Sequence, residues 1–237
     1  KSRIELQKFS NWFHTNQGGN WPTVIGGWAV WSYHNNGFGS RDADLIFPTD
    51  DWIEDMMKKI YFPGNGFQEF KIGDPIFGEP HYGKPITTDD IIFFDLISAE
   101  TPREDSVNMG VEVDWNWVYE TEHPESIGDG ASINVPELEF LITLKIIGCI
   151  SRSRKLHLAS DKFYFLSKIW KDCYDVANLT NHLTPNSGKL FHHFTKTKLD
   201  KKLIQEFLEI CDGRQSALSE GNSKMGPIED LLKVFKK

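Results

Sequence analysis

Apolar residues recur at helical or strand spacing along most of the chain, and their pattern changes about halfway. The first half predicts short elements of both kinds. These are a helix over Ile4–Phe13, a strand over Thr23–Ile25, a helix over Trp28–His34, a strand over Arg41–Phe47 and a helix whose apolar face runs from Trp52 to Ile60. Residues 61–90 are rich in Gly and Pro and predict short antiparallel strands joined by long turns.

Two more strands are predicted before the pattern changes to helices. Ile91–Ser98 is apolar on both faces, which predicts a central strand covered on both sides, and Val111–Tyr119 predicts another strand. Beyond Pro136 helices are predicted over Glu137–Ser151, Lys162–Leu183 and Lys198–Cys211. The sequence therefore predicts an α+β fold, with a mixed β-sheet domain flanked by helices (1–135) followed by a C-terminal helical bundle (136–237).

The composition permits such a fold and restricts its partners. The chain has 237 residues, 39% of them hydrophobic, which is enough to bury one large core or two smaller ones. Its formal charge of -8 argues against broad, nonspecific binding to nucleic acid, which needs clustered Lys and Arg. Lys189–Lys202 nevertheless carries five lysines and two histidines, so the C-terminal part is locally basic.

The sequence suggests a cytoplasmic protein without a membrane span. The richest apolar stretch, Phe140–Ile150, is interrupted by Lys145 and is shorter than the roughly 18 residues that a span requires. No signal peptide is visible, although the chain starts without Met. Cys149, Cys173 and Cys211 show no metal-ligand spacing and are predicted to be ordinary thiols in a reducing cytoplasm.

Gly26-Gly27 lies where a strand is predicted to pass into a helix. Glycines at such a junction let the backbone approach a phosphate closely, and the helix N-terminus supplies unpaired amides and a positive dipole. Two glycines can also form a simple turn, so the pair alone does not define a site.

Asp42 and Asp44 follow on the next predicted strand, fifteen residues past Gly27. Because side chains alternate along a strand, the two carboxylates share one face, where they repel each other and lose hydration. Divalent cations such as Mg2+, which prefer oxygen ligands, would offset that cost. The alternative is a solvated face at a sheet edge.

Asp95 interrupts the apolar run of Ile91–Ser98, where a lone carboxylate is costly unless it is paired or binds a metal. The alternatives are a pair with a nearby Arg or Lys, or a strand end in water. Together the three acids predict a site for two Mg2+ ions, with Asp42 and Asp44 bridging both ions. Asp95 would complete the first site and accept the proton of the nucleophile.

Val24-Ile25-Gly26-Gly27-Trp28-Ala29-Val30 and Gly39-Ser40-Arg41-Asp42-Ala43-Asp44-Leu45 resemble the signature of the polymerase-beta-like nucleotidyltransferases. The resemblance implies a nucleotidyltransferase sheet domain and a nucleoside triphosphate, such as ATP, as substrate. It also implies that Gly26 and Gly27 hold the triphosphate, with Ser40 beside it. Many relatives carry an Arg two residues before the Ser, where this chain has Phe38, and Arg41 would then take its place.

The C-terminal half resembles the AbiE-type toxin nucleotidyltransferases, which serve in abortive-infection and toxin–antitoxin systems. The similar segments are Pro136–Lys145, a following arginine that is either Arg152 or Arg154, and Lys171–Leu179 with its Lys-Asp-x-x-Asp pattern. This resemblance implies nucleotide-binding roles for Lys145, Lys171, Asp172 and Asp175, RNA such as tRNA as the acceptor, and an antitoxin protein as partner. The segment Lys155–Ile169 is an insertion relative to that pattern.

The helical spacing of these residues leaves alternatives open. Lys145 lies on an apolar helix stripe, where its ammonium needs an anionic partner, either a nucleotide phosphate or a structural carboxylate such as Asp172. Asp172 and Asp175 lie three apart on one helix face. His81, in the Gly- and Pro-rich segment, could line the cleft but is not assigned a role.

Four functions are consistent with this sequence. The first is a nucleotidyltransferase acting on RNA such as tRNA, or on protein. The acidic charge and the Gly-Gly-Trp-Ala-Val string suggest instead a small cationic acceptor, as in aminoglycoside nucleotidyltransferases. The third is a catalytically inactive nucleotide-binding module, against which the intact Asp42, Asp44 and Asp95 argue. The fourth is a metal-dependent hydrolase that uses the same carboxylates and releases monophosphate without modifying an acceptor.

Overall fold

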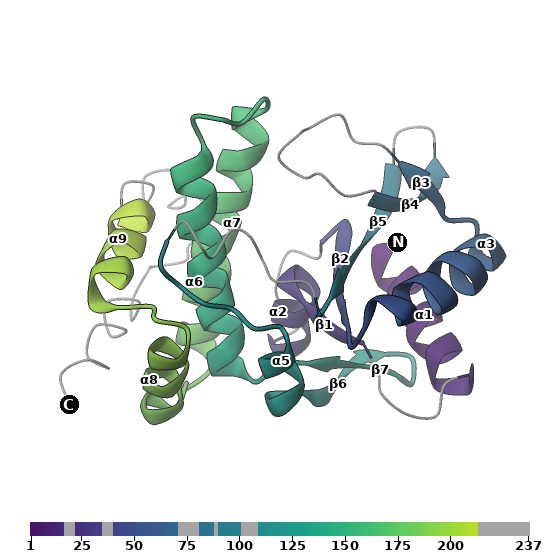
Figure 1. The fold of residues 1–237 in the computed structure, drawn as a ribbon, viewed down its shortest axis with the longest axis horizontal. Coiled ribbons are helices and arrows are strands. Elements are labelled where there is room, and N and C mark those ends of the chain that lie inside the picture. The colour runs from purple at the N-terminus through teal and green to yellow at the C-terminus, as the bar shows by residue number, and fades with distance from the viewer. Residues whose placement is uncertain (17–21, 35–39, 71–80, 88–89, 101–108, 213–237) are drawn as a thin grey trace. The chain divides into compact units, whose positions relative to one another are not determined.

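The computed structural model describes residues 1–16, 22–34, 40–70, 81–87, 90–100 and 109–212 (Figure 1). The chain divides into two compact units. The sheet unit comprises Lys1–Pro102 and Asp114–Glu137, and the helical unit comprises Arg103–Val113 and Leu138–Lys237.

The described part of the sheet unit contains a seven-stranded mixed sheet with the strand order β3-β4-β5-β2-β1-β7-β6. Its strands are β1 (Thr23–Ile25), β2 (Asp42–Phe47), β3 (Gln68–Phe70), β4 (His81–Thr87), β5 (Asp90–Ser98), β6 (His123–Gly128) and β7 (Ala131–Val135). β2 pairs with β5 in parallel, as β1 does with β7, and the other pairs are antiparallel. The predicted α+β class and mixed sheet are confirmed.

Among its described residues the sheet unit has the helices α1 (Ser2–Asn16), α2 (Gly26–His34), η1 (Trp52–Tyr61), α3 (Phe62–Asn65) and α5 (Asn116–Thr121). Aromatic side chains of α1 and η1 pack on one face of β5: the ring centroids of Phe9 and Tyr61 lie 5.6 and 6.4 Å from that of Phe94. The opposite face of β5, which carries Asp95, is only half-buried. The prediction that β5 is covered on both faces is therefore wrong, because this aromatic layer lies on one side.

Val111–Tyr119 does not form the predicted strand. The Asp114 side chain accepts a hydrogen bond from the Asn116 backbone N–H at 2.9 Å, and its carbonyl accepts one from Trp117 at 3.0 Å. These bonds start the short helix α5, because an Asp side chain satisfies helix N-terminal amides that a strand would pair with its neighbour.

The helical unit contains α6 (Leu138–Lys155), α7 (Lys162–His182), α8 (Ser187–Lys196) and α9 (Lys201–Asp212). α6 and α7 run alongside each other (Figure 1), and α6 also packs against α8 and α9. The three predicted helices are confirmed. α8 was not predicted, and it begins where the side chain of Asn186 accepts hydrogen bonds from the backbone N–H groups of Gly188 and Lys189. No helix in the described ranges is long and apolar enough to cross a membrane.

The three cysteines meet inside the helical unit. Cys173 of α7 and Cys211 of α9 form a disulfide, and Cys149 of α6 is a buried thiol whose sulfur lies 3.8 Å from that of Cys173. The prediction of three ordinary thiols is therefore wrong for two of them. Motif spacing gave no sign of the bond because helix packing brings together residues that are 38 positions apart.

Loss of this disulfide should destabilise the helical unit. Closing a loop of this length restricts the unfolded chain, so Cys211→Ser is expected to lower the free energy of unfolding by about 4 kcal/mol without reductant. Urea unfolding followed by circular dichroism measures this change. Wild-type protein in dithiothreitol is the matched comparison, and equal urea midpoints with and without dithiothreitol would contradict the expectation.

Candidate active site

The three predicted acidic residues lie on one face of the sheet. β2 and β5 are adjacent and parallel, with Asp44 directly opposite Asp95 and Asp42 opposite Phe93. Cross-strand partners point to the same face, as do residues two apart on one strand. Asp42, Asp44 and Asp95 therefore project together from the half-buried face of the sheet.

The turn from β1 into α2, formed by Gly26 and Gly27, lies against these carboxylates. Ile25 of β1 pairs with Asp44 on the side of β2 away from β5, and Gly26 then begins α2. Gly26 has a φ of +70°, and a Cβ at this position would lie 2.0 Å from Asp44 Oδ2. Only glycine leaves room for the carboxylate here, so the Asp44 side chain packs directly against the backbone at the start of α2.

The N-terminus of α2 is suited to an anion. Its first turn holds Gly26 and Gly27 and contains no acidic side chain. The first amides of a helix have no partner within the helix, and the helix dipole favours negative charge at this end. A phosphate bound there would lie close to the carboxylate of Asp44. Because the two negative charges repel each other, a cation between them would be needed.

We expect Gly26→Ala to impair the site more than it impairs the fold. Gly66→Ala is the matched control, because Gly66 has a similar φ of +74° and open space around it. Each change should lower the free energy of unfolding by roughly 1–2 kcal/mol, because alanine is strained in a left-handed backbone conformation. Only Gly26→Ala displaces Asp44, and a shift of about 1 Å can lower a rate by about 100-fold. Parallel measurement of thermal unfolding and of the nucleotidyl transfer that the sequence predicts tests this, and equal activity of the two variants would contradict it.

Asp95 has a histidine partner. His81 Nδ1 lies 2.6 Å from Asp95 Oδ1, and both side chains are partly buried. His81 precedes Tyr82, which pairs with Phe94 across β4 and β5, so the histidine faces Asp95 in the sheet. Sequence reasoning assigned His81 no role, because only the register of β4 against β5 shows that the two residues meet.

Ser40 and Arg41 lead into β2. The Ser40 carbonyl accepts a hydrogen bond from the Ser2 hydroxyl at 2.8 Å, and the Arg41 carbonyl accepts one from the Phe93 N–H at 3.3 Å. The side chain of Arg41 is exposed and that of Ser40 half-buried. Phe38 lies outside the described residues.

The predicted residues of the C-terminal half meet in a buried charge cluster of the helical unit. Lys145 Nζ of α6 lies 2.6 Å from Asp175 Oδ2 and 3.2 Å from Asp172 Oδ1, both on α7. Lys171 Nζ lies 3.1 Å from Asp175 Oδ2, and Arg152 of α6 donates to Asp172. Lys145, Asp172 and Asp175 are 8%, 4% and 1% exposed. The structure thus pairs Lys145 with carboxylates, the structural alternative left open by the sequence.

The charges in this cluster stabilise one another. Burial alone would lower the pKa of Lys145, but the carboxylates of Asp175 and Asp172 outweigh it and raise that pKa. Burial alone would raise the pKa of Asp172, but Arg152 and Lys145 hold it below its usual value. Burial and the charge of Lys145 lower the pKa of Lys171. Both Lys145 and Asp172 are therefore charged at neutral pH.

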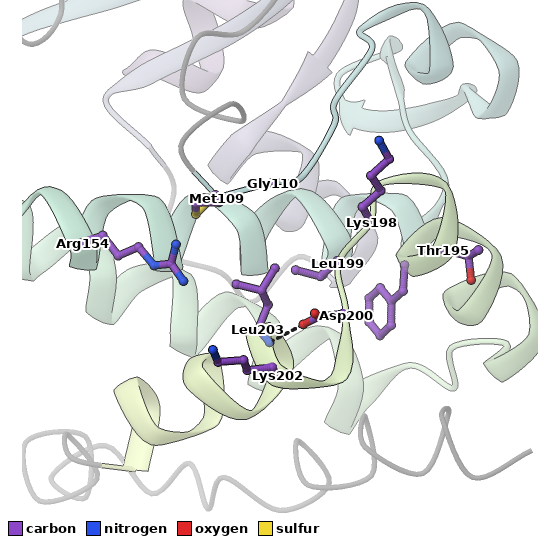
Figure 2. Close-up of a pocket in the computed structure, with 10 residues that line it drawn as sticks. Met109, Gly110, Arg154, Thr195, Lys198, Leu199, Asp200, Lys202 and Leu203 are labelled. Atoms are coloured by element: carbon purple, nitrogen blue, oxygen red, sulfur yellow. Dashed lines mark hydrogen bonds between the residues drawn. The ribbon is translucent and has the colours of Figure 1, made fainter.

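A hollow of about 610 Å³ lies elsewhere in the helical unit, lined by residues of α6, α8 and α9 and by Met109 and Gly110 (Figure 2). Two of its cationic groups have carboxylate partners: Arg154 donates to both oxygens of Glu206, and Lys198 pairs with Glu112. Asp200 caps α9 through the Leu203 N–H at 2.8 Å. These two pairs reduce the attraction of the hollow for an anion, and the hollow contains none of the predicted site residues.

The mixed sheet with its flanking helices has a nucleotidyltransferase-like fold. The chain resembles in structure an antigenic nucleotidyltransferase-like protein from Paracoccidioides brasiliensis. The TM-score is 0.51 at 12% sequence identity, and the match covers 98% of this chain and 92% of the other. At this identity the likeness concerns the fold. No protein-family model matches the chain, and no curated protein matches its sequence.

Proposed function

We propose that the protein is a Mg2+-dependent nucleotidyltransferase that moves a nucleoside monophosphate from an NTP to an acceptor hydroxyl. The observation that carries this proposal is the meeting of Asp42, Asp44 and Asp95 on one sheet face, with Gly26 against Asp44. A nucleotidyltransferase-like fold supports it.

The donor set suits Mg2+. Three carboxylates supply only oxygen ligands, and their mutual repulsion favours binding of a divalent cation. Asp42, Asp44 and Asp95 are the residues that would hold the proposed pair of Mg2+ ions. Bound Mg2+ lowers the pKa of an attacking hydroxyl and neutralises charge on the triphosphate and on the departing pyrophosphate.

The chain's own groups then have distinct tasks. The amides at the start of α2, including those of Gly26 and Gly27, would bind the triphosphate, with Ser40 and Arg41 near it. Asp95 would accept the proton of the acceptor hydroxyl. The acceptor oxygen forms a bond to the α-phosphorus, the bond from that phosphorus to the pyrophosphate oxygen breaks, and pyrophosphate leaves.

For the acceptor we propose RNA such as tRNA. The resemblance of the Lys145 helix and of Lys171–Leu179 to AbiE-type toxins supports this choice and suggests an antitoxin protein as partner. The same resemblance makes Lys145, Lys171, Asp172 and Asp175 candidates for nucleotide binding, whereas the contacts of Lys145 with Asp175 and Asp172 favour a structural role. Such an enzyme would act in the cytoplasm, where NTPs and tRNA occur.

Label transfer tests the proposed function. Wild-type protein and Asp44→Ala are incubated with each α-labelled NTP, Mg2+ and total RNA, with parallel reactions on total protein and on an aminoglycoside. We expect Mg2+-dependent label on RNA, lost in Asp44→Ala. Label on the aminoglycoside alone would overturn the RNA acceptor. NTP binding without transfer to any acceptor, or release of monophosphate alone, would overturn nucleotidyl transfer itself.

A further inference from the structure

His81 and Asp95 form a side-chain pair within the row of acidic residues. Asp95 lies on β5, whose neighbours in the sheet are β2 and β4. Asp44 lies opposite it on β2, and His81 of β4 is hydrogen-bonded to it. The distance from His81 Nδ1 to Asp95 Oδ1 is 2.6 Å, at the short end for a hydrogen bond to a charged group. His81, Asp95 and Asp44 therefore lie in line across three neighbouring strands.

This hydrogen bond gives the two oxygens of Asp95 different roles, because His81 contacts only Oδ1. With Nδ1–H as the donor, the imidazole holds Oδ1 and fixes the rotation of the carboxylate about its last bond. The other oxygen is then held in one orientation on the face that carries Asp44. Hydrogen bonds of this kind orient the ligands of a metal and influence how tightly the metal binds.

The pair is not a part of the aromatic core. The neighbours of His81 and Asp95, Tyr82 and Phe94, point to the opposite face, where the rings of Tyr82 and Phe62 stack at 4.6 Å. The side chains of His81 and Asp95 retain 19% and 29% exposure. Since the core packs without it, this polar pair is better explained by the orientation of Asp95 than by stability.

We propose that His81 is a positioning residue that orients Asp95 for divalent-cation binding. This inference rests on the proposed function, because it concerns the same acidic residues. It predicts that divalent-cation binding depends on a hydrogen-bond donor at the position of Nδ1. The charge and the ring of the histidine should not affect that binding.

Two substitutions separate the donor from the ring. His81→Leu removes the hydrogen bond, whereas His81→Asn retains a short side-chain amide that can donate to Asp95. The control is His123→Leu, because His123 of β6 also lies beside a carboxylate, at 3.2 Å from Glu125, and belongs to the same unit. Thermal unfolding of all three variants shows whether the fold is kept.

The first readout is binding of Mn2+ to the protein without NTP, followed by calorimetric titration. His81→Leu is expected to weaken binding by about 10–100-fold, as substitutions of residues that orient a metal ligand do. His81→Asn should stay within about threefold of wild type if the donor is what matters, and His123→Leu should be unchanged. Wild-type affinity in His81→Leu, or equal loss in the Leu and Asn variants, would overturn the proposal.

The second readout separates this inference from the proposed function. In the transfer assay, His81→Leu should require more Mg2+ for half-maximal rate, and His81→Asn should restore the requirement. If wild type transfers no label but binds Mn2+ with the expected dependence on residue 81, the proposed function fails and the positioning role stands. If wild type transfers label and His81→Leu has the same Mg2+ requirement, the positioning role fails alone.

Discussion

Asp44→Asn and Asp95→Asn are each expected to lower the rate of nucleotidyl transfer by roughly 10²–10⁴-fold or more, since each removes metal-ligand charge and Asp95 is also the proposed base. The amide keeps the shape of the side chain but cannot compensate a divalent cation. Asp44 and Asp95 lie on a half-buried sheet face outside the aromatic core, so thermal unfolding should change little.

Asp90→Asn is the matched control for this pair of variants. Asp90 lies on the same strand as Asp95, and its carboxylate pairs with Lys1 at 3.1 Å near the surface. An exposed pair of this kind contributes about 0–1 kcal/mol, and its loss should leave transfer unchanged. If Asp90→Asn and Asp95→Asn lost activity equally, the acidic face formed by Asp42, Asp44 and Asp95 would not be the active site.

Local pattern was enough to place part of this site. Strand alternation put Asp42 and Asp44 on one face, and the turn residues Gly26-Gly27 marked the start of a helix. The pairing of Asp44 with Asp95 could not be predicted from the same pattern. Register between strands that are about fifty residues apart depends on the whole sheet, and one step of slippage would turn Asp95 to the other face.

Helix α5 and the β6–β7 hairpin were not predicted, because they depend on local hydrogen bonds and turn residues that do not appear in the spacing of apolar residues. Asp114 starts α5 through hydrogen bonds to the chain that follows it, although Val111–Tyr119 alternates like a strand. The β6–β7 hairpin turns at Gly128-Asp129-Gly130, where all three residues have positive φ. A turn of this type was readable from its glycines, but the flanking strands contain too many polar residues to stand out.

In the helical unit, sequence spacing singled out residues that contact one another without showing how they interact. Asp172 and Asp175 were correctly placed on one helix face, and both contact Lys145. Whether a buried ammonium faces phosphate or carboxylate depends on which helix packs against it, and this follows from tertiary structure. The disulfide between Cys173 and Cys211 was not predicted for the same reason, because it depends on how α7 packs against α9.

Lys145→Met is expected to lower the free energy of unfolding by about 3–5 kcal/mol, because it leaves two buried carboxylates short of a partner. Methionine has a similar length and no charge, so the loss measures the ion pairs more than the packing. Urea unfolding followed by circular dichroism provides the value. The control is Lys198→Met in the same unit, whose pair with Glu112 is exposed and should contribute about 0–1 kcal/mol.

A double variant distinguishes a structural from a nucleotide-binding role for Lys145. If carboxylates are its partners, Lys145→Met with Asp175→Asn should be more stable than the sum of the two single losses predicts, because the uncompensated charge is gone. If Lys145 serves mainly to hold a phosphate, Lys145→Met should unfold like wild type without nucleotide and lose the stabilisation that an added NTP gives. The distances of 2.6 and 3.2 Å to Asp175 and Asp172 favour the first result, in which these ion pairs help to hold α6 and α7 together.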